Sequence, residues 1–239
     1  QGSLGGKARG LVFLKQQLAS CPELHAEFAG LQVFVPSTLV LTTEVFDAFL
    51  AQNHLRIYSR TTLTDEEIAA LFTRARMPAE VSAALRSFLQ RADFPLAVRS
   101  SSLLEDSLTK PYAGIYRTVM VPNRDPDPDV RLAQLVEAIQ LVYASTFFED
   151  PRAFARRTGH KPDEEKMAVV IQKLVGRPQG ELFFPAISGV AQSYNHYPMA
   201  PMRPEDGIAI VALGLGKTVV DGERSLRFCP AYPDKLPQF

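Results

Sequence analysis

Segments with helical spacing dominate the first part of this 239-residue chain, and segments with strand character dominate the later part. This separation favours an α+β fold over a regular alternation of strands and helices. We place an approximate helix-rich part at residues 1–125 and a strand-rich part at residues 160–239, within one domain that spans residues 1–239. The hydrophobic content of 46% is enough for a substantial core.

Apolar residues three or four positions apart predict the helices. Leu11, Leu14 and Leu18 follow a glycine-rich opening, so the first helix begins at the glycines. The other expected helices are one capped by Thr42 or Thr43, one opened by the capping box Thr64-x-x-Glu67, one begun by Pro78, a long one running to Phe147, and a shorter one from Pro151 to Arg157.

Apolar and β-branched runs bounded by turn residues predict the strands. The expected strands cover an extended pair at 33–36 and 38–41, then 94–98, 115–121, 167–175, 181–190 and 208–213. Residues 176–180 have the glycine and proline content of a turn that joins two of these strands.

Charge and cysteine usage exclude several classes of protein. Lys and Arg total 26, as do Asp and Glu, so no net field attracts a nucleic acid or an anionic membrane. Cys21 and Cys229 lie far apart without metal-ligand spacing, and no apolar run approaches 18 residues. We therefore expect a cytoplasmic protein with no nucleic-acid or membrane partner. The four histidines show no metal or triad spacing.

The stretch Leu96-Ala-Val-Arg-Ser-Ser-Ser-Leu-Leu-Glu-Asp106 carries the clearest chemistry. The Arg99 guanidinium suits a phosphate, and the three serines after it add hydroxyl and backbone donors. A structural alternative is equally open at this point. Arg99 would then pair with Glu105 or Asp106, and the serines would form a turn.

Further candidates for nucleotide contacts lie elsewhere in the chain. Lys7 follows Gly5 and Gly6 at a helix start, which suits a phosphate but also fits a flexible entry with a solvated lysine. Gly114 permits a close backbone approach, and we expect Thr118 on the same strand and face. Gln172, inside an apolar run, either reads an adenine edge or is an ordinary satisfied polar group.

Gly216-Lys217-Thr218 ends like a phosphate-binding P-loop, but Val211 stands where that motif needs its first glycine. We expect the residues after Thr218 to form a strand and a turn rather than a helix. The sequence therefore argues against a P-loop and places Lys217 in a turn between strands.

Several segments in order resemble the N-terminal ATP-binding domain of phosphoenolpyruvate synthase and pyruvate phosphate dikinase, over almost the whole chain. They are Leu4-Gly-Gly-Lys-Ala8, Val35-Pro36 with Leu39-Val-Leu-Thr-Thr43, Ala97-Val-Arg-Ser-Ser-Ser102 with Glu105-Asp-Ser107, Ala113-Gly114, Met167-Ala-Val-Val-Ile-Gln172 and Gly214-Leu-Gly216. The resemblance implies an ATP-grasp type nucleotide-binding domain of two lobes with ATP between them. It also implies that Lys7 and Arg99 hold phosphates and act in catalysis, that Gly114 and Thr118 line the phosphate side, and that Gln172 meets the adenine.

The resemblance further implies ATP and Mg²⁺ as cofactors, with a phosphohistidine-bearing swivelling domain and an acceptor-binding domain as partners in a longer parent chain. The family's metal ligands follow the Gly-Leu-Gly segment, and no matching segment precedes Phe239. We therefore expect a piece truncated at its C-terminal end that is inactive alone. The acceptor, whether pyruvate, an antibiotic or a glucan, and the oligomeric state stay open. Lys217, where the family has an acid, leaves a non-catalytic nucleotide-binding regulatory or interaction module as the alternative.

Overall fold

The computed structural model describes residues 2–23, 30–60, 62–102, 114–158, 165–222 and 225–235. The chain divides into two compact units, residues Gln1–Leu174 and Val175–Phe239, which we call unit 1 and unit 2. Unit 1 contains helices on a four-stranded sheet, and unit 2 consists mainly of short antiparallel strands.

The sheet of unit 1 has the strand order β1-β4-β2-β3, and every neighbouring pair is antiparallel. Its strands are β1 (Thr38–Leu41), β2 (Leu96–Ser102), β3 (Thr118–Val121) and β4 (Met167–Lys173). The central strands β2 and β4 pair along seven residues, from Leu96 opposite Lys173 to Ser102 opposite Met167.

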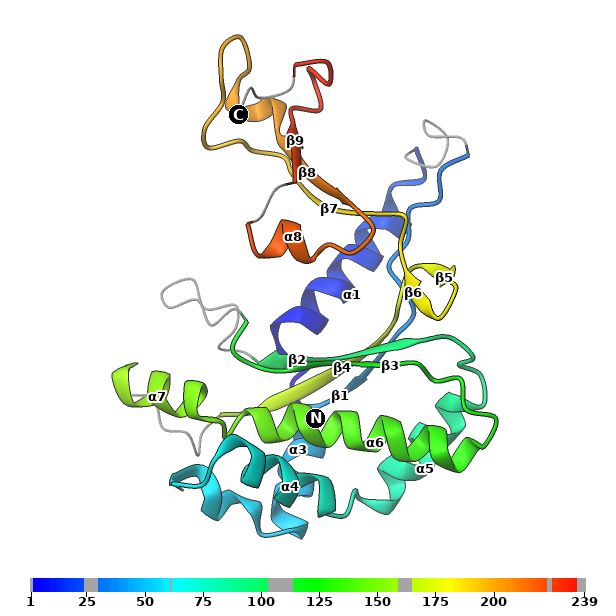
Figure 1. Ribbon diagram of the computed structural model, residues 1–239, viewed down its shortest axis with the longest axis vertical. Coiled ribbons are helices and arrows are strands. Elements are labelled where there is room, and N and C mark those ends of the chain that lie inside the picture. The colour runs from blue at the N-terminus through cyan, green and yellow to red at the C-terminus, as the bar shows by residue number, and fades with distance from the viewer. Residues whose placement is uncertain are drawn as a thin grey trace. The chain divides into compact units, whose positions relative to one another are not determined.

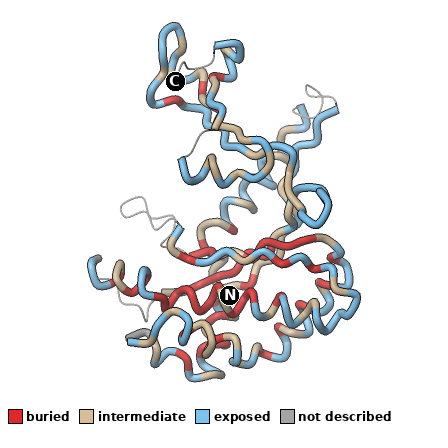
Figure 2. The backbone as a smooth tube through the Cα atoms, in the orientation of Figure 1, coloured by how far each residue is buried: buried red, intermediate tan, exposed pale blue. Residues whose placement is uncertain are grey.

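Helices cover one face of this sheet. They are α3 (Thr43–Gln52), α4 (Asp65–Arg74), α5 (Ala79–Leu89), α6 (Pro128–Ser145) and α7 (Glu149–Thr158), with a 3₁₀ helix at Leu55–Arg60. Figure 1 shows α6 along the sheet, with α3, α4 and α5 on the same side. The buried residues concentrate on β2, β4 and α6 (Figure 2).

Local sequence signals explain where these helices begin. The Thr64 hydroxyl accepts from the backbone N–H of Glu67, and the Glu67 carboxylate accepts from that of Thr64, as the capping box predicts. At the start of α6, Asp127 caps the helix and Pro128 occupies its first turn. The predicted starts at Thr42, Thr64 and Pro78 are confirmed.

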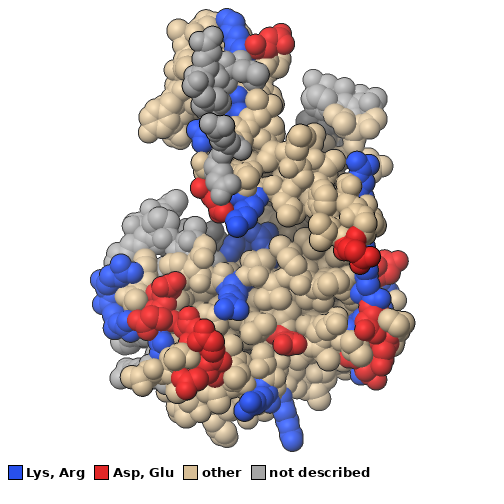
Figure 3. Space-filling model, in the orientation of Figure 1, with Lys and Arg blue, Asp and Glu red and all other residues tan. Residues whose placement is uncertain are grey.

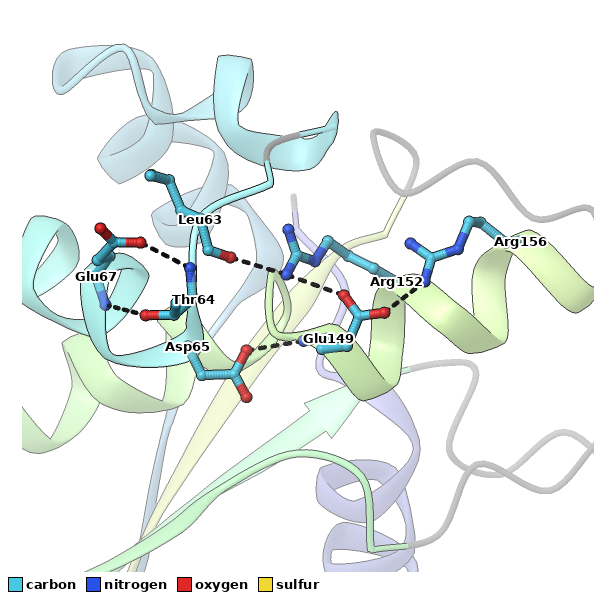
Figure 4. Close-up of polar contacts among 7 residues, drawn as sticks. All are labelled: Leu63, Thr64, Asp65, Glu67, Glu149, Arg152 and Arg156. Carbon is cyan, nitrogen blue, oxygen red and sulfur yellow. Dashed lines mark hydrogen bonds and ion pairs between the residues drawn. The ribbon is translucent and has the colours of Figure 1, made fainter.

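A polar cluster joins the start of α4 to α7 (Figure 4). The backbone N–H of Glu149 donates to the Asp65 carboxylate, and the buried Arg152 donates to the carbonyl oxygen of Leu63. Arg152 and Arg156 both form ion pairs with Glu149. The pKa of Glu149 is lowered, first by the hydrogen bond from Arg156 and further by the charges of both arginines.

Helix α1 (Gly5–Ser20) begins on the other face of the sheet, opposite α6 (Figure 1). Gly5 and Ala8, in its first turn, are its buried residues. Phe13 and Leu14 are exposed, so the predicted apolar face of Leu11, Leu14 and Leu18 does not pack into the core.

Unit 2 contains the hairpin of β5 (Arg177–Gln179) and β6 (Leu182–Phe184), and the sheet of β7 (Ile187–Gln192), β8 (Ile208–Leu213) and β9 (Leu226–Phe228). A 3₁₀ turn (Pro204–Asp206) precedes β8, and the one-turn helix α8 (Lys217–Val220) follows it.

Several sequence predictions were wrong in detail. Residues 33–36 are not a strand, and β1 pairs with β4 instead. The strand expected at 94–98 begins at Leu96 and continues through Ser102, because β4 supplies hydrogen-bonding partners along its length. The strand expected at 181–190 is interrupted around Pro185, which has no N–H to donate, and the expected turn at 176–180 contains β5.

Among the residues that the structure describes, no helix is both long enough and apolar enough to cross a membrane.

Candidate functional site

The strand register places three of the predicted binding residues on one face of the unit 1 sheet. Arg99 on β2 is directly opposite Thr118 on β3, and Gln172 on β4 is opposite Ala97, two residues before Arg99. Directly paired residues project to the same side of a sheet, and so do residues two apart on one strand. Arg99, Thr118 and Gln172 therefore share a face.

This face is the one opposite α3, α4, α5 and α6, and α1 begins on it next to Ser101. We call it the open face. Val98 and Ile171, the intervening residues of β2 and β4, belong to the core that packs under α6. On the open face, Thr118 and Met120 are exposed, while Arg99 and Gln172 are half-buried. The side-chain amide of Gln172 donates to the hydroxyl of Thr38, on the neighbouring strand β1, at 3.3 Å.

The Arg99 guanidinium has no hydrogen-bond or ion-pair partner among the described residues. The alternative prediction, an ion pair between Arg99 and Glu105 or Asp106, concerns residues outside the described ranges. The serines next to it form a strand and not a turn. None of the five donors of Arg99 is used by a described residue, and their planar arrangement suits a planar or tetrahedral anion.

Lys7 lies against the same strand. Its Nζ atom donates to the carbonyl oxygen of Ser100 at 3.2 Å and to the Ser100 hydroxyl at 3.3 Å. Lys7 therefore contacts the residue that follows Arg99 in β2, although the side chains of Arg99 and Ser100 project to opposite faces of the sheet. The convergence of Lys7 and Arg99 on one phosphate stays a prediction.

Ser101 fixes the start of α1, a role that the sequence alone did not reveal. Its hydroxyl donates to the Leu4 carbonyl oxygen at 3.0 Å and accepts from the Ala8 N–H at 3.2 Å. Gly5 has φ +73°, and a Cβ atom there would lie 1.8 Å from the Ser101 carbonyl oxygen. The signal was the pair Gly5-Gly6, for which the sequence left open a phosphate-binding helix start and a flexible entry. Gly5 serves close packing.

Gly114 does not lie on the strand of Thr118, contrary to prediction. Strand β3 begins at Thr118, and Gly114 has φ +81°, a left-handed conformation that interrupts an extended strand. A Cβ atom at Gly114 would have no neighbour within 4 Å among the described residues. Its predicted approach to a phosphate stays a prediction.

Lys217 was expected in a turn between strands, and that expectation was wrong. Residues Lys217–Val220 form α8, because the N–H groups of Val219 and Val220 both donate to the Gly216 carbonyl oxygen. The helix has only four residues and Val211 lies inside β8, so the long helix and first glycine of a P-loop are both missing.

No metal-binding cluster was found in the part of the chain that the structure describes: it has no group of three His, Cys, Asp or Glu side chains suited to a metal ion. His54 and His196 lie in separate units, and His25 and His160 fall outside the described ranges. Acidic and basic side chains lie next to one another over the visible helical part of unit 1, in keeping with equal totals of each (Figure 3).

Comparison with known proteins identifies the family. Residues 1–227 match the family described as the AMP/ATP-binding domain of pyruvate phosphate dikinase. The chain is also 28% identical, over 208 residues, to the rifampicin phosphotransferase of Streptomyces sviceus. That similarity covers 79% of this chain and 21% of the relative, so the chain spans about a fifth of the length of the curated relative that it matches.

Proposed function

This chain belongs to the family of pyruvate phosphate dikinase AMP/ATP-binding domains, and we propose that it binds ATP on the open face of the unit 1 sheet. The family match and the observed mixture of helices and sheet confirm the predicted α+β fold and are consistent with an ATP-grasp type domain. The observation that carries the proposed site is the position of the Arg99 guanidinium, which has no partner among the described residues, on the same face as Thr118 and Gln172.

The order of side chains along the open face suggests how ATP lies. The Gln172 amide, which beyond its hydrogen bond to Thr38 has a second N–H donor and a carbonyl oxygen, meets the adenine edge. Arg99 and Thr118, one row further along β2 and about 7 Å away, meet the phosphates. Lys7, against Ser100, adds a second positive charge at the end of this track. Arg99 binds through its planar fork, whereas Lys7 acts as a point charge.

We further propose that ATP serves here as a phosphoryl donor to a histidine on a partner domain, as the resemblance to dikinases implies. Positioning and charge neutralisation dominate phosphoryl transfer, and Arg99 and Lys7 supply them on the protein side. Magnesium is expected with ATP, but the described residues offer no acidic cluster to hold it, so we assign it no ligands. The relative's name concerns rifampicin. The acceptor of this chain's parent, whether pyruvate, an antibiotic or a glucan, is a separate question.

The five methionines allow a direct binding test, because Met120 alone among them lies on the open face of the sheet. With ¹³C-methyl-labelled methionine, ATP should shift the Met120 signal. Arg99→Lys keeps the charge but loses the fork, and should weaken ATP binding about tenfold.

Arg91→Lys is the matched control, because Arg91 is exposed and lies just after α5. This substitution should leave the affinity for ATP unchanged. An unchanged affinity in Arg99→Lys, or an ATP response that bypasses Met120, would refute the assigned site.

A non-catalytic nucleotide-binding module is the second candidate, favoured by the exposed Lys217 where the family carries an acid. It predicts the same ATP titration but no ATP-dependent phosphorylation of a histidine in the parent protein. Incubation of the parent with γ-labelled and β-labelled ATP separates the two candidates, because only an active dikinase-type domain labels the protein.

A further inference from the structure

Unit 2 contains a pocket that the proposed ATP site does not use. It lies where the connection between β7 and β8 meets the end of β9 and the turn after it, and its volume is about 220 Å³. Two contacts hold these segments together. The backbone N–H of Asn195 donates to the Pro204 carbonyl oxygen at 2.8 Å, and the Cys229 thiol donates to the carbonyl oxygen of Asp206. We call it the Met199 pocket.

The lining is apolar and adaptable. Met199 and Met202 come from the connection, Ile208 from β8 and Phe228 from β9. Thioethers pack well against aromatic rings and adjust to their shape. The volume is below the range of about 300–1,000 Å³ that is usual for drug-sized ligands, so a single ring with a short substituent is the appropriate size.

The polar groups of the Met199 pocket are donors. Arg227 and Lys235 line it, and no described acidic residue does. Asn195 is 8% exposed, and its Oδ1 atom accepts from the Tyr197 N–H at 3.0 Å. Its Nδ2 group has no hydrogen-bond partner among the described residues, although it belongs to a buried side chain in the lining. An amide donor without a partner among the described residues, beside two cations, favours an anionic oxygen.

We propose that the Met199 pocket binds a small aromatic carboxylate. The ring packs against Met199, Met202 and Phe228, and the carboxylate accepts from Arg227 and from Nδ2 of Asn195. Lys235 adds positive charge at the rim. The ligand is a free small molecule and not a nucleotide, so this site is independent of the ATP site on the open face.

The same ¹³C-methyl-methionine sample tests both sites, using the complete 239-residue chain. Phenylacetate should shift the Met199 and Met202 signals with a dissociation constant of about 1 mM or tighter, and should leave Met77, Met120 and Met167 unchanged. Phenylacetamide, which is neutral and similar in shape, should bind about tenfold more weakly because it lacks the charge-assisted hydrogen bonds. Inorganic phosphate should not displace phenylacetate, because it lacks the ring.

Arg227→Met keeps the apolar stem and should weaken phenylacetate binding about tenfold. Arg177→Met is the control, because Arg177 is exposed on β5 and does not line the pocket. This substitution should leave phenylacetate binding unchanged. Absence of binding, equal binding of acid and amide, or an equal effect of both variants would overturn the proposal. Competition by ATP would show that the pocket belongs to the nucleotide site. If Arg227→Met fails to fold, the comparison of acid and amide on the unaltered chain decides.

Discussion

Tyr143 illustrates how completely the core of unit 1 is closed. Its side chain is fully buried, with ring centroids 4.9 Å from Phe46 and 5.4 Å from Phe49. Its hydroxyl has no hydrogen-bond partner among the described residues. Burial without a partner raises the pKa of Tyr143 well above its ordinary value, because the phenolate would be desolvated.

We expect Tyr143→Phe to raise the free energy of unfolding by about 1 kcal/mol, since it removes an unsatisfied buried hydroxyl and keeps the ring. Chemical denaturation of both proteins measures the change. Tyr194→Phe, at a half-exposed position of unit 2, is the control and should change stability by less than about 0.5 kcal/mol. A clear loss of stability in Tyr143→Phe would mean that the hydroxyl does have a partner.

At the scale of elements, α1 is held at its first turn and is exposed beyond it. Gly5→Ala would place a Cβ atom against the Ser101 carbonyl oxygen at a positive φ, where L side chains are strained by about 1–2 kcal/mol before any clash. We expect faster amide hydrogen exchange throughout α1 and weaker ATP binding, because Lys7 lies in that turn.

Gly10→Ala is the matched control for Gly5→Ala. It lies in the same helix, and a Cβ atom there meets nothing within 4 Å among the described residues. This substitution should slow exchange in α1, because alanine favours a helix interior over glycine by about 0.5–1 kcal/mol. Equal behaviour of the two variants would argue that α1 is not anchored through Gly5.

The contact between α4 and α7 should depend on pH through Glu149. Its pKa is lowered in the folded protein, so it contributes stability above its unfolded value near 4.5 and loses that contribution as the pH falls below it. We expect Glu149→Gln to lower the unfolding temperature at neutral pH, and the difference from the unaltered protein to shrink at pH values below 4.5. Salt should reduce the effect, because Glu149 is exposed.

Glu80→Gln, at an exposed position in the first turn of α5, is the control for Glu149→Gln. Glu80 lies on α5 and not in the polar cluster of Glu149, so the effect of Glu80→Gln on stability should depend little on pH by comparison. A Glu149→Gln difference that persists undiminished in acid would show that the contribution is not electrostatic.

At the scale of the whole molecule, the two units differ in how much they bury. The apolar core cluster runs from Leu41 to Ile171 and lies entirely within unit 1. Among the described residues of unit 2, the buried apolar ones are Ala209 and Cys229. Unit 1 therefore has the core that cooperative folding requires.

We expect residues 1–174 alone to unfold cooperatively, at a temperature close to that of the main transition of the complete chain. Residues 175–239 alone should show little cooperativity. Differential scanning calorimetry of the three proteins measures this. Failure of residues 1–174 to fold would show that unit 2 contributes to the stability of unit 1.

The sequence by itself determined the features that depend on neighbouring residues. The capping box at Thr64 and Glu67 and the apolar run of β4 were predicted because their signals act within one or two turns or along one strand. The separation of helical and strand patterns along the chain gave the α+β class, and the resemblance gave the family. The single strand expected at 181–190 was wrong, because the apolar pattern of its residues did not take account of Pro185. Proline has no N–H to donate to a neighbouring strand.

Tertiary structure alone decided the composition of the candidate site. Arg99, Thr118 and Gln172 share a face only because β2 pairs with both β3 and β4 in one register, and a shift by one residue would move a side chain to the other face. Tertiary structure also decides the position of Lys7, which contacts β2 because Ser101 and Gly5 fix the start of α1. Hydrogen bonds between distant segments set these positions, and no local pattern of residues encodes them.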